Sequence, residues 1–103
     1  MIKILISLFL AIVVIACAGR DPNKYVAAAD GEALYKKYCV LCHGVDGKLG
    51  LNGSKDISVS QLTLAERITQ ITKGKNTMTP FEGIMSPQEI KAVAEYSMTL
   101  TRK

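Results

Sequence analysis

The sequence YCVLCHGVDGKLG, residues 38–50, is the most informative part of this 103-residue chain. Cys39 and Cys42 are separated by two residues, and His43, the chain's only histidine, follows directly. A cysteine pair at this spacing serves three chemistries: a thiol–disulfide switch, a metal site or a covalently attached cofactor. The other residues of the chain discriminate among them.

Zinc and disulfide chemistry both fit the chain poorly. A structural zinc site usually has four ligands in two separated pairs. Outside the motif the chain offers only Cys17, next to an apolar N-terminal run, and no second histidine. A thioredoxin-type switch belongs to a strand–helix–strand unit, and no strand pattern is visible. A switch would also leave the role of His43 unexplained.

The motif Cys-x-x-Cys-His is typical of covalent haem attachment, in which two thiols join the haem vinyl groups and the histidine binds iron. Cysteines one helical turn apart reach two neighbouring edges of one porphyrin, and the next residue directs its imidazole at the iron from the same side. We therefore predict one covalent haem c held by Cys39, Cys42 and His43. Because the chain has no second histidine, the opposite ligand must be a different residue type.

Helix signals flank the motif on both sides. Three segments each have, at their first or second position, a residue whose side chain can cap a helix N-terminus. These segments and caps are 30–39 with Asp30, 62–75 with Thr63, and 86–103 with Ser86. Glu66 and Glu89, three residues after their caps, predict two capping boxes. The glycine-rich stretch after the motif and the segment around Pro80 are expected to be loops.

With these parts in place, the chain resembles the small bacterial class I cytochromes c from Ala29 to Leu100. The resemblance rests on DGEALYKKYCVLCHG, the glycine-rich loop, GKNTMTPF and MSPQEIKAVAEY. It implies an all-α cytochrome c fold with three main helices around one covalent haem. That family uses a methionine sulfur as the sixth iron ligand, which Met78 matches, with Met85 as the second choice.

The resemblance also suggests packing and orienting residues. Gly31 and Tyr35 match the glycine and the aromatic at which the family's first helix crosses its last, with Tyr96 as their counterpart. His43 should donate its second ring N–H to a backbone carbonyl. The family usually takes this carbonyl from a loop proline. The loop here has none, so we expect a carbonyl within residues 50–53.

The N-terminus is typical of an export signal, because Lys3 precedes an apolar run at 4–16 that contains one polar residue, Ser7. VIAC, residues 14–17, resembles the lipobox of bacterial lipoproteins and predicts lipidation of Cys17. Ordinary cleavage after Ala18 and a retained single-span helix are the alternatives. The predicted organisation is a lipoprotein-type signal peptide at 1–16, a flexible tether at 17–29 and a cytochrome c domain at 30–103. The mature protein is expected on the periplasmic side, anchored to the membrane by lipid or secreted into the periplasm.

The resemblance implies a carrier of single electrons between respiratory or other redox partners outside the cytoplasm, and not an enzyme. Membrane respiratory complexes are the expected partners, with no small-molecule substrate. A net charge of +4 without a Lys/Arg run does not indicate nucleic-acid binding. Two alternatives stay open: a gas-binding or sensing haem protein with an open iron site, and the subunit through which electrons enter a larger membrane redox enzyme.

Overall fold

A computed structural model describes residues 29–101 of the chain. Its helices and 3-10 turns, in order, are α2 (Gly31–Tyr38), α3 (Val40–His43), η2 (Leu51–Gly53), η3 (Ile57–Val59), α4 (Leu64–Lys73) and α5 (Pro87–Thr99). Within residues 29–101 there is no β-strand, only an isolated bridge between Lys75 and Met78. The predicted all-α architecture is confirmed.

The predicted signal at 1–16, the lipidated Cys17 and nearly all of the tether at 17–29 lie outside the described residues. Residues 102 and 103 lie outside them as well. Within the described part of the chain, no helix is both long and apolar enough to cross a bilayer.

The helices begin where the sequence predicted. Asp30 Oδ1 accepts a hydrogen bond from a first-turn backbone N–H of α2 at 3.1 Å. Thr63 and Glu66 form the full capping box, with reciprocal bonds of 3.2 and 2.7 Å. Hydrogen bonding by Thr63, above all from its backbone N–H, lowers the pKa of the Glu66 carboxyl. The second box is only half formed. Ser86 Oγ accepts a hydrogen bond from Glu89 N at 3.2 Å. The reciprocal bond of a full box, from Ser86 N–H to the Glu89 carboxylate, is not formed.

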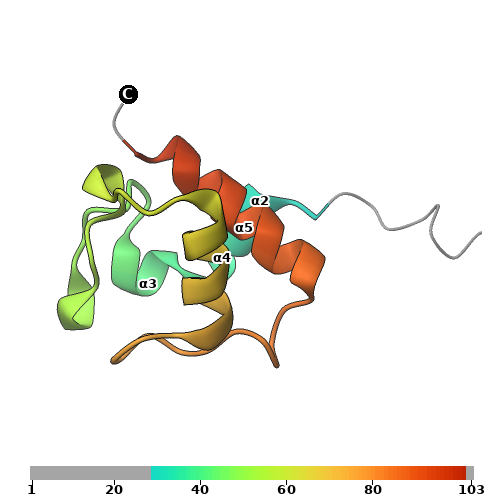
Figure 1. The fold of residues 1–103 in the computed structure, drawn as a ribbon. Helices are drawn as coiled ribbons and strands as arrows, with labels where there is room; N and C mark the ends of the chain where they lie inside the picture. The colour runs from blue at the N-terminus through green and yellow to red at the C-terminus, as the bar shows by residue number, and fades with distance from the viewer. Residues whose placement is uncertain (1–28, 102–103) are drawn as a thin grey trace, which may run out of the picture.

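Helices α2 and α5 pack directly against each other, as Figure 1 shows. At the crossing, Gly31 lies so close to Ala92 that a Cβ at position 31 would be 2.7 Å from the carbonyl carbon of Ala92. The rings of Tyr35 and Tyr96 pack beside this contact, with centroids 5.2 Å apart and planes tilted by 52°. The expected glycine–aromatic crossing is therefore confirmed.

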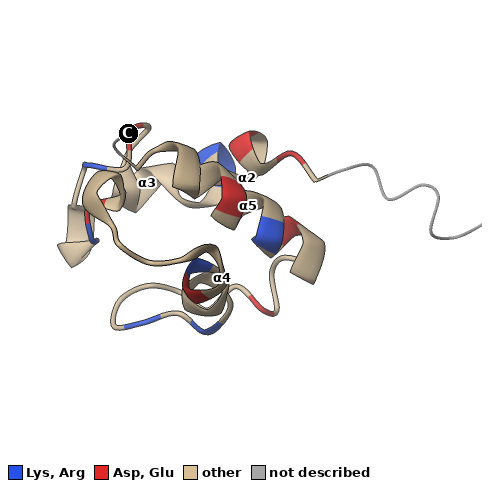
Figure 2. Cartoon of the chain, turned by 45° about the horizontal axis from the view of Figure 1, so that its top comes forward, with Lys and Arg blue, Asp and Glu red and all other residues tan. Residues whose placement is uncertain are grey.

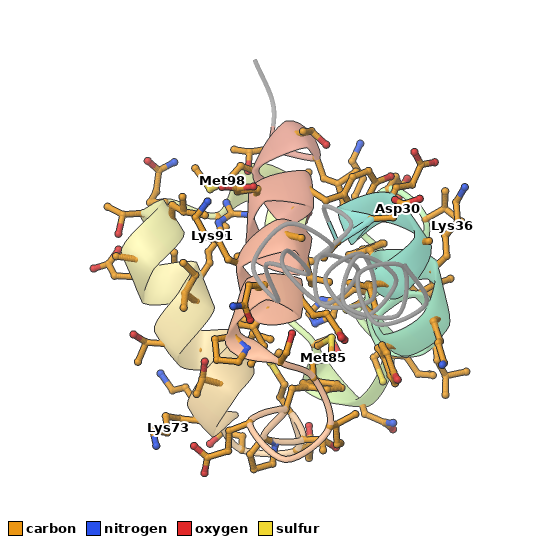
Figure 3. All side chains as sticks on the ribbon, turned by 90° about the vertical axis from the view of Figure 1, so that its right-hand side faces the viewer. Asp30, Lys36, Lys73, Met85, Lys91 and Met98 are labelled. Atoms are coloured by element: carbon orange, nitrogen blue, oxygen red, sulfur yellow. The ribbon has the colours of Figure 1, made fainter. Side chains whose placement is uncertain are left out.

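Helix α5 forms the centre of the fold, with α4 on one side and α2 on the other, as Figure 3 shows with α5 running from bottom to top. The buried core gathers at the facing sides of these helices. Its members are Tyr35, Cys39, Ile71, Phe81, Met85, Ile90, Val93 and Ala94. Because Cys39 belongs to this core, the Cys-x-x-Cys-His motif starts inside the folded domain and is not on a detached loop.

Candidate functional site

The Cys-x-x-Cys-His motif spans the junction of two helices. Helix α2 ends just before Cys39, and α3 follows as a separate short helix. The backbone N–H groups of Cys42 and His43 both donate to the carbonyl oxygen of Cys39, at 3.3 and 2.9 Å. Cys39 and Cys42 therefore lie one turn apart. Gly44, with a φ of 76°, ends α3 immediately after the histidine.

A cavity of about 490 Å³ lies beside the motif. It is lined by Cys39 and His43 of the motif and by Met78 from the segment between α4 and α5, so two distant parts of the chain meet there. Cys42 is half-buried and is not among the lining residues. Met85 does not line the cavity either. It is packed in the core, and Figure 3 labels it near the start of α5. The volume lies within the roughly 300–1,000 Å³ typical of cofactor sites.

The imidazole of His43 is oriented by the backbone of the following loop. Its Nδ1 lies 3.2 Å from the carbonyl oxygen of Lys55. A carbonyl oxygen only accepts, so Nδ1 carries the hydrogen and Nε2 keeps its lone pair. Burial lowers the pKa of His43, more than the Lys55 hydrogen bond raises it. The ring is therefore neutral at pH 7, which is the form that binds metal ions.

The carbonyl that orients His43 is not within residues 50–53, so that expectation was wrong. Two of the carbonyls there are engaged with other groups. Leu51 O accepts two bonds, of 3.1 and 2.6 Å, that close η2, and Asn52 O accepts from Thr77 Oγ1 at 3.1 Å. Asn52, inside η2, has a non-helical conformation. The carbonyl oxygen of Lys55, just after η2, makes the contact with His43 Nδ1.

The Cys39 thiol does not have the properties of a redox-active cysteine. Burial, more than the neighbouring Cys42, raises the pKa of the Cys39 thiol to about 11. A thiol that stays protonated is a poor nucleophile for disulfide exchange. Both thiols are free. No cluster of three or more metal-binding His, Cys, Asp or Glu side chains occurs within residues 29–101, which disfavours zinc.

Met78 is presented by the irregular segment between α4 and α5. Gly74 ends α4 with a φ of 67°, and a Cβ at this position would lie 2.8 Å from Pro80 N. Only glycine adopts this left-handed conformation without strain. The backbone N–H of Met78 then donates to Lys75 O at 2.9 Å, which closes a tight turn. The amide Nε2 of Gln70 in α4 lies 3.9 Å from Met78 Sδ.

The remaining cavity wall is largely apolar. It includes Ile57, Val59, Leu62, Ile71 and Val93. Val59 and Leu62 are 51% and 41% exposed, so large apolar side chains face the space beside the histidine and the methionine. An apolar wall, a neutral imidazole and a thioether together match what a covalently bound haem requires. The residues present therefore fit that group.

Comparison with known proteins agrees with this chemistry. Residues 26–96 match the family described as cytochrome c oxidase, cbb3-type, subunit III. Cytochrome c6 of Microcystis aeruginosa is 31% identical over 80 residues, which cover 72% of this chain and 98% of that protein. The chain belongs to the c-type cytochromes. This cytochrome also resembles a solved structure, the KustC0563 c-type cytochrome, at 30% identity and a TM-score of 0.63, covering 71% of this chain and 99% of that one.

This cytochrome carries one covalently bound haem c and transfers single electrons between redox proteins, and it is not an enzyme. The predictions of fold, cofactor and electron-transfer function are confirmed. A further relative is the cbb3-type cytochrome c oxidase subunit FixP of Bradyrhizobium diazoefficiens, 32% identical over 93 residues. That match covers 81% of this cytochrome but only 31% of FixP.

Sequence reasoning missed one buried charge in the cavity wall. Arg67 of α4 is only 5% exposed and lines the cavity. It stands three residues after Leu64 and four before Ile71, which places it on the apolar face of the helix. A charged residue in register with an apolar stripe is the signal that could have identified it.

Proposed function

We propose that Cys39 and Cys42 attach the haem through thioether bonds, with His43 Nε2 and Met78 Sδ as the two axial iron ligands. The observation that supports this is that the motif residues Cys39 and His43 and the distant Met78 line one cavity. When bound, the haem supplies the one-electron oxidation and reduction. Lys55 O fixes the ring of His43, and the turn from Lys75 fixes the backbone of Met78. The apolar wall excludes water, which favours the reduced state.

Replacing Met78 tests this assignment and separates it from the gas-binding alternative. Met78→Ala should keep the haem, because the cysteines and His43 are unchanged. It should lower the reduction potential by about 0.1 V or more, since the choice of axial ligand spans about 0.8 V. The weak long-wavelength absorption band that reports an iron–methionine bond should disappear. Redox titration and ferric spectra of the purified holoprotein measure both effects.

The control for this experiment is Met98→Ala, because Met98 in α5 is 39% exposed and does not line the cavity. It should leave potential and spectrum unchanged. An unchanged Met78→Ala protein, with the band lost in Met85→Ala, would move the ligand to Met85. A native high-spin spectrum that responds readily to carbon monoxide would instead favour an open iron site.

We further infer that the protein works on the periplasmic side, anchored to the membrane through lipid on Cys17. The support is the lipobox-like VIAC after a short apolar run. Cys17→Ser should move most of the protein from the membrane to the soluble fraction after cell lysis and ultracentrifugation. Ala18→Ser, which keeps the cysteine, should remain with the membrane. Membrane retention of Cys17→Ser would favour an uncleaved helix, and a soluble parent protein would favour simple secretion.

The redox partners we propose are membrane respiratory complexes with acidic docking surfaces. Lys55 and Lys75 are exposed and line the cavity, where they can steer an acidic partner. Lys36 and Lys73 contribute less, because each pairs with a glutamate, at 2.7 and 2.8 Å. Figure 2 shows basic and acidic positions interspersed along the chain. A permanent subunit of a cbb3-type oxidase, the alternative that the matched family's description favours, would co-purify with its complex in mild detergent.

A further inference from the structure

A side-chain hydrogen bond joins the two segments that position the proposed iron ligands. The first segment is the loop after the motif, in which Lys55 O orients the ring of His43. The second is the tight turn that carries Met78. Both segments line the cavity. Thr77 Oγ1, next to Met78, donates to the backbone carbonyl oxygen of Asn52 at 3.1 Å and so links the turn to the loop across 25 residues of sequence.

The backbone has an uncommon conformation at both ends of this hydrogen bond. Among the described residues, Asn52 and Asn76 are the two non-glycine residues with a positive φ, of 53° and 54°. Asn52 carries the acceptor carbonyl, and Asn76 directly precedes the donor Thr77. Asparagine is one of the few non-glycine residue types that adopt this left-handed conformation, and such residues cluster at functional sites. Both uncommon backbone angles thus lie at one contact.

We propose that Thr77 is a positioning residue for the sixth iron ligand, because its hydrogen bond to Asn52 holds the Met78 turn against the loop. This inference rests on the proposed assignment of Met78 as an axial ligand. Because Thr77 and Met78 are adjacent in the chain, a movement that withdraws the sulfur also carries the hydroxyl away from Asn52. An external ligand can bind the iron only after Met78 has withdrawn, so its apparent affinity follows the population of that open state. Loss of the hydrogen bond should raise this population.

Thr77→Val tests the proposal, because it removes the hydroxyl and keeps the branched shape of the side chain. Titration of the full-length ferric holoprotein with imidazole, followed by the loss of the iron–methionine band, measures the apparent affinity. The affinity should rise by about 2- to 12-fold over the parent protein, the equilibrium equivalent of one ordinary hydrogen bond. Thr77→Ser, which keeps the hydroxyl and loses the methyl group, should restore the parental affinity. A residue that acts only through packing would not show this rescue.

Thr69→Val is the matched control. The Thr69 side chain is exposed and does not line the cavity, and its hydroxyl donates to Ala65 O within α4 at 3.1 Å. Its substitution removes the same hydroxyl from a threonine whose hydrogen bond stays within one helix. The imidazole affinity of Thr69→Val should equal that of the parent protein, even if its Tm differs.

The acceptor end of the hydrogen bond gives a second test that leaves Thr77 unchanged. Asn52→Ala disfavours the left-handed conformation at the residue that carries the acceptor carbonyl, so it should raise the imidazole affinity as Thr77→Val does. Asn52→Gly permits that conformation and should stay close to the parent protein. Since both substitutions act on one hydrogen bond, the double variant Thr77→Val/Asn52→Ala should bind imidazole no more tightly than the single variants.

Three results would overturn the proposal: parental affinity in Thr77→Val, an affinity in Thr77→Ser as high as in Thr77→Val, or fully additive effects in the double variant. The ferric spectrum keeps this question apart from the ligand assignment. An iron–methionine band in the parent protein, together with unchanged imidazole affinity in Thr77→Val, rejects the role of Thr77 alone. Absence of that band in the parent protein rejects the proposed ligand set instead.

Discussion

His43→Ala is expected to yield a protein without stably bound haem. The substitution removes Nε2, the nitrogen that we propose as an iron ligand. Because Nδ1 donates its hydrogen to Lys55 O, the lone pair of Nε2 is available to bind iron. Loss of a residue that only orients a ligand already costs about 10–100-fold in metal affinity, so loss of the ligand should lower haem content by more than about tenfold. Haem absorbance per polypeptide after denaturing extraction measures this.

The same substitution should also weaken the fold. Four members of the buried core, Tyr35, Cys39, Ile71 and Val93, line the cavity of about 490 Å³. A small domain has little other core to compensate, so the helices depend on what fills this space. Far-UV circular dichroism of His43→Ala should therefore show reduced helix content at room temperature, compared with the parent holoprotein.

Leu41→Ala is the matched control, because Leu41 lies between the two cysteines and is 78% exposed. It should load haem normally and keep its helix content. Normal loading and an unchanged spectrum in His43→Ala would remove His43 from the iron. Equal loss of haem in Leu41→Ala would mean that the motif acts through recognition during haem attachment, and not through the ligand we propose.

The helix starts could be predicted because capping is local. Thr63 and Glu66 satisfy each other's backbone donors within four residues, so the sequence contains the whole interaction. The helix ends were less predictable. The first helix was expected to run into the motif, but α2 stops before Cys39, and the third was expected to reach residue 103, whereas α5 ends at Thr99.

The rest of the site could not be predicted, because it depends on contacts between distant residues. Lys55 orients His43 across 12 residues, and Thr77 donates to the nearby carbonyl of Asn52 from 25 residues further along. Arg67 is buried because Ser97, 30 residues away, provides acceptors for it. Local spacing carries no information about such pairings. It could show where the motif lies, but not which backbone carbonyls would remain free to orient it.

Gly31→Ala is expected to destabilise the protein strongly, although alanine is the better helix former by about 1 kcal/mol. A Cβ at this position would overlap the carbonyl oxygen of Ala92 and lie 3.2 Å from Tyr96 Cβ. The obstacle is the backbone of α5, which does not move as a flexible side chain would. Relief requires α2 to shift away from α5, which loosens the packing of Tyr35 on Tyr96.

The steric cost should therefore outweigh the gain in helix propensity. We expect the free energy of unfolding to fall by about 3 kcal/mol, the upper part of the usual range for overpacking. For a domain of this size that corresponds to a fall of roughly 12–24 °C in Tm. Thermal unfolding of the holoprotein, followed by circular dichroism, measures it directly.

Gly83→Ala is the matched control for Gly31→Ala. A Cβ at position 83 would have no atom within 4 Å, and Gly83 does not adopt the left-handed conformation. The remaining effect is that alanine allows the unfolded chain fewer conformations than glycine does. The free energy of unfolding should therefore rise by about 0.4–1 kcal/mol. The same chemical change thus has opposite signs at the two positions, because only Gly31 faces another backbone. If both variants were as stable as the parent, α2 and α5 would have to lie further apart than the contact between Gly31 and Ala92 requires.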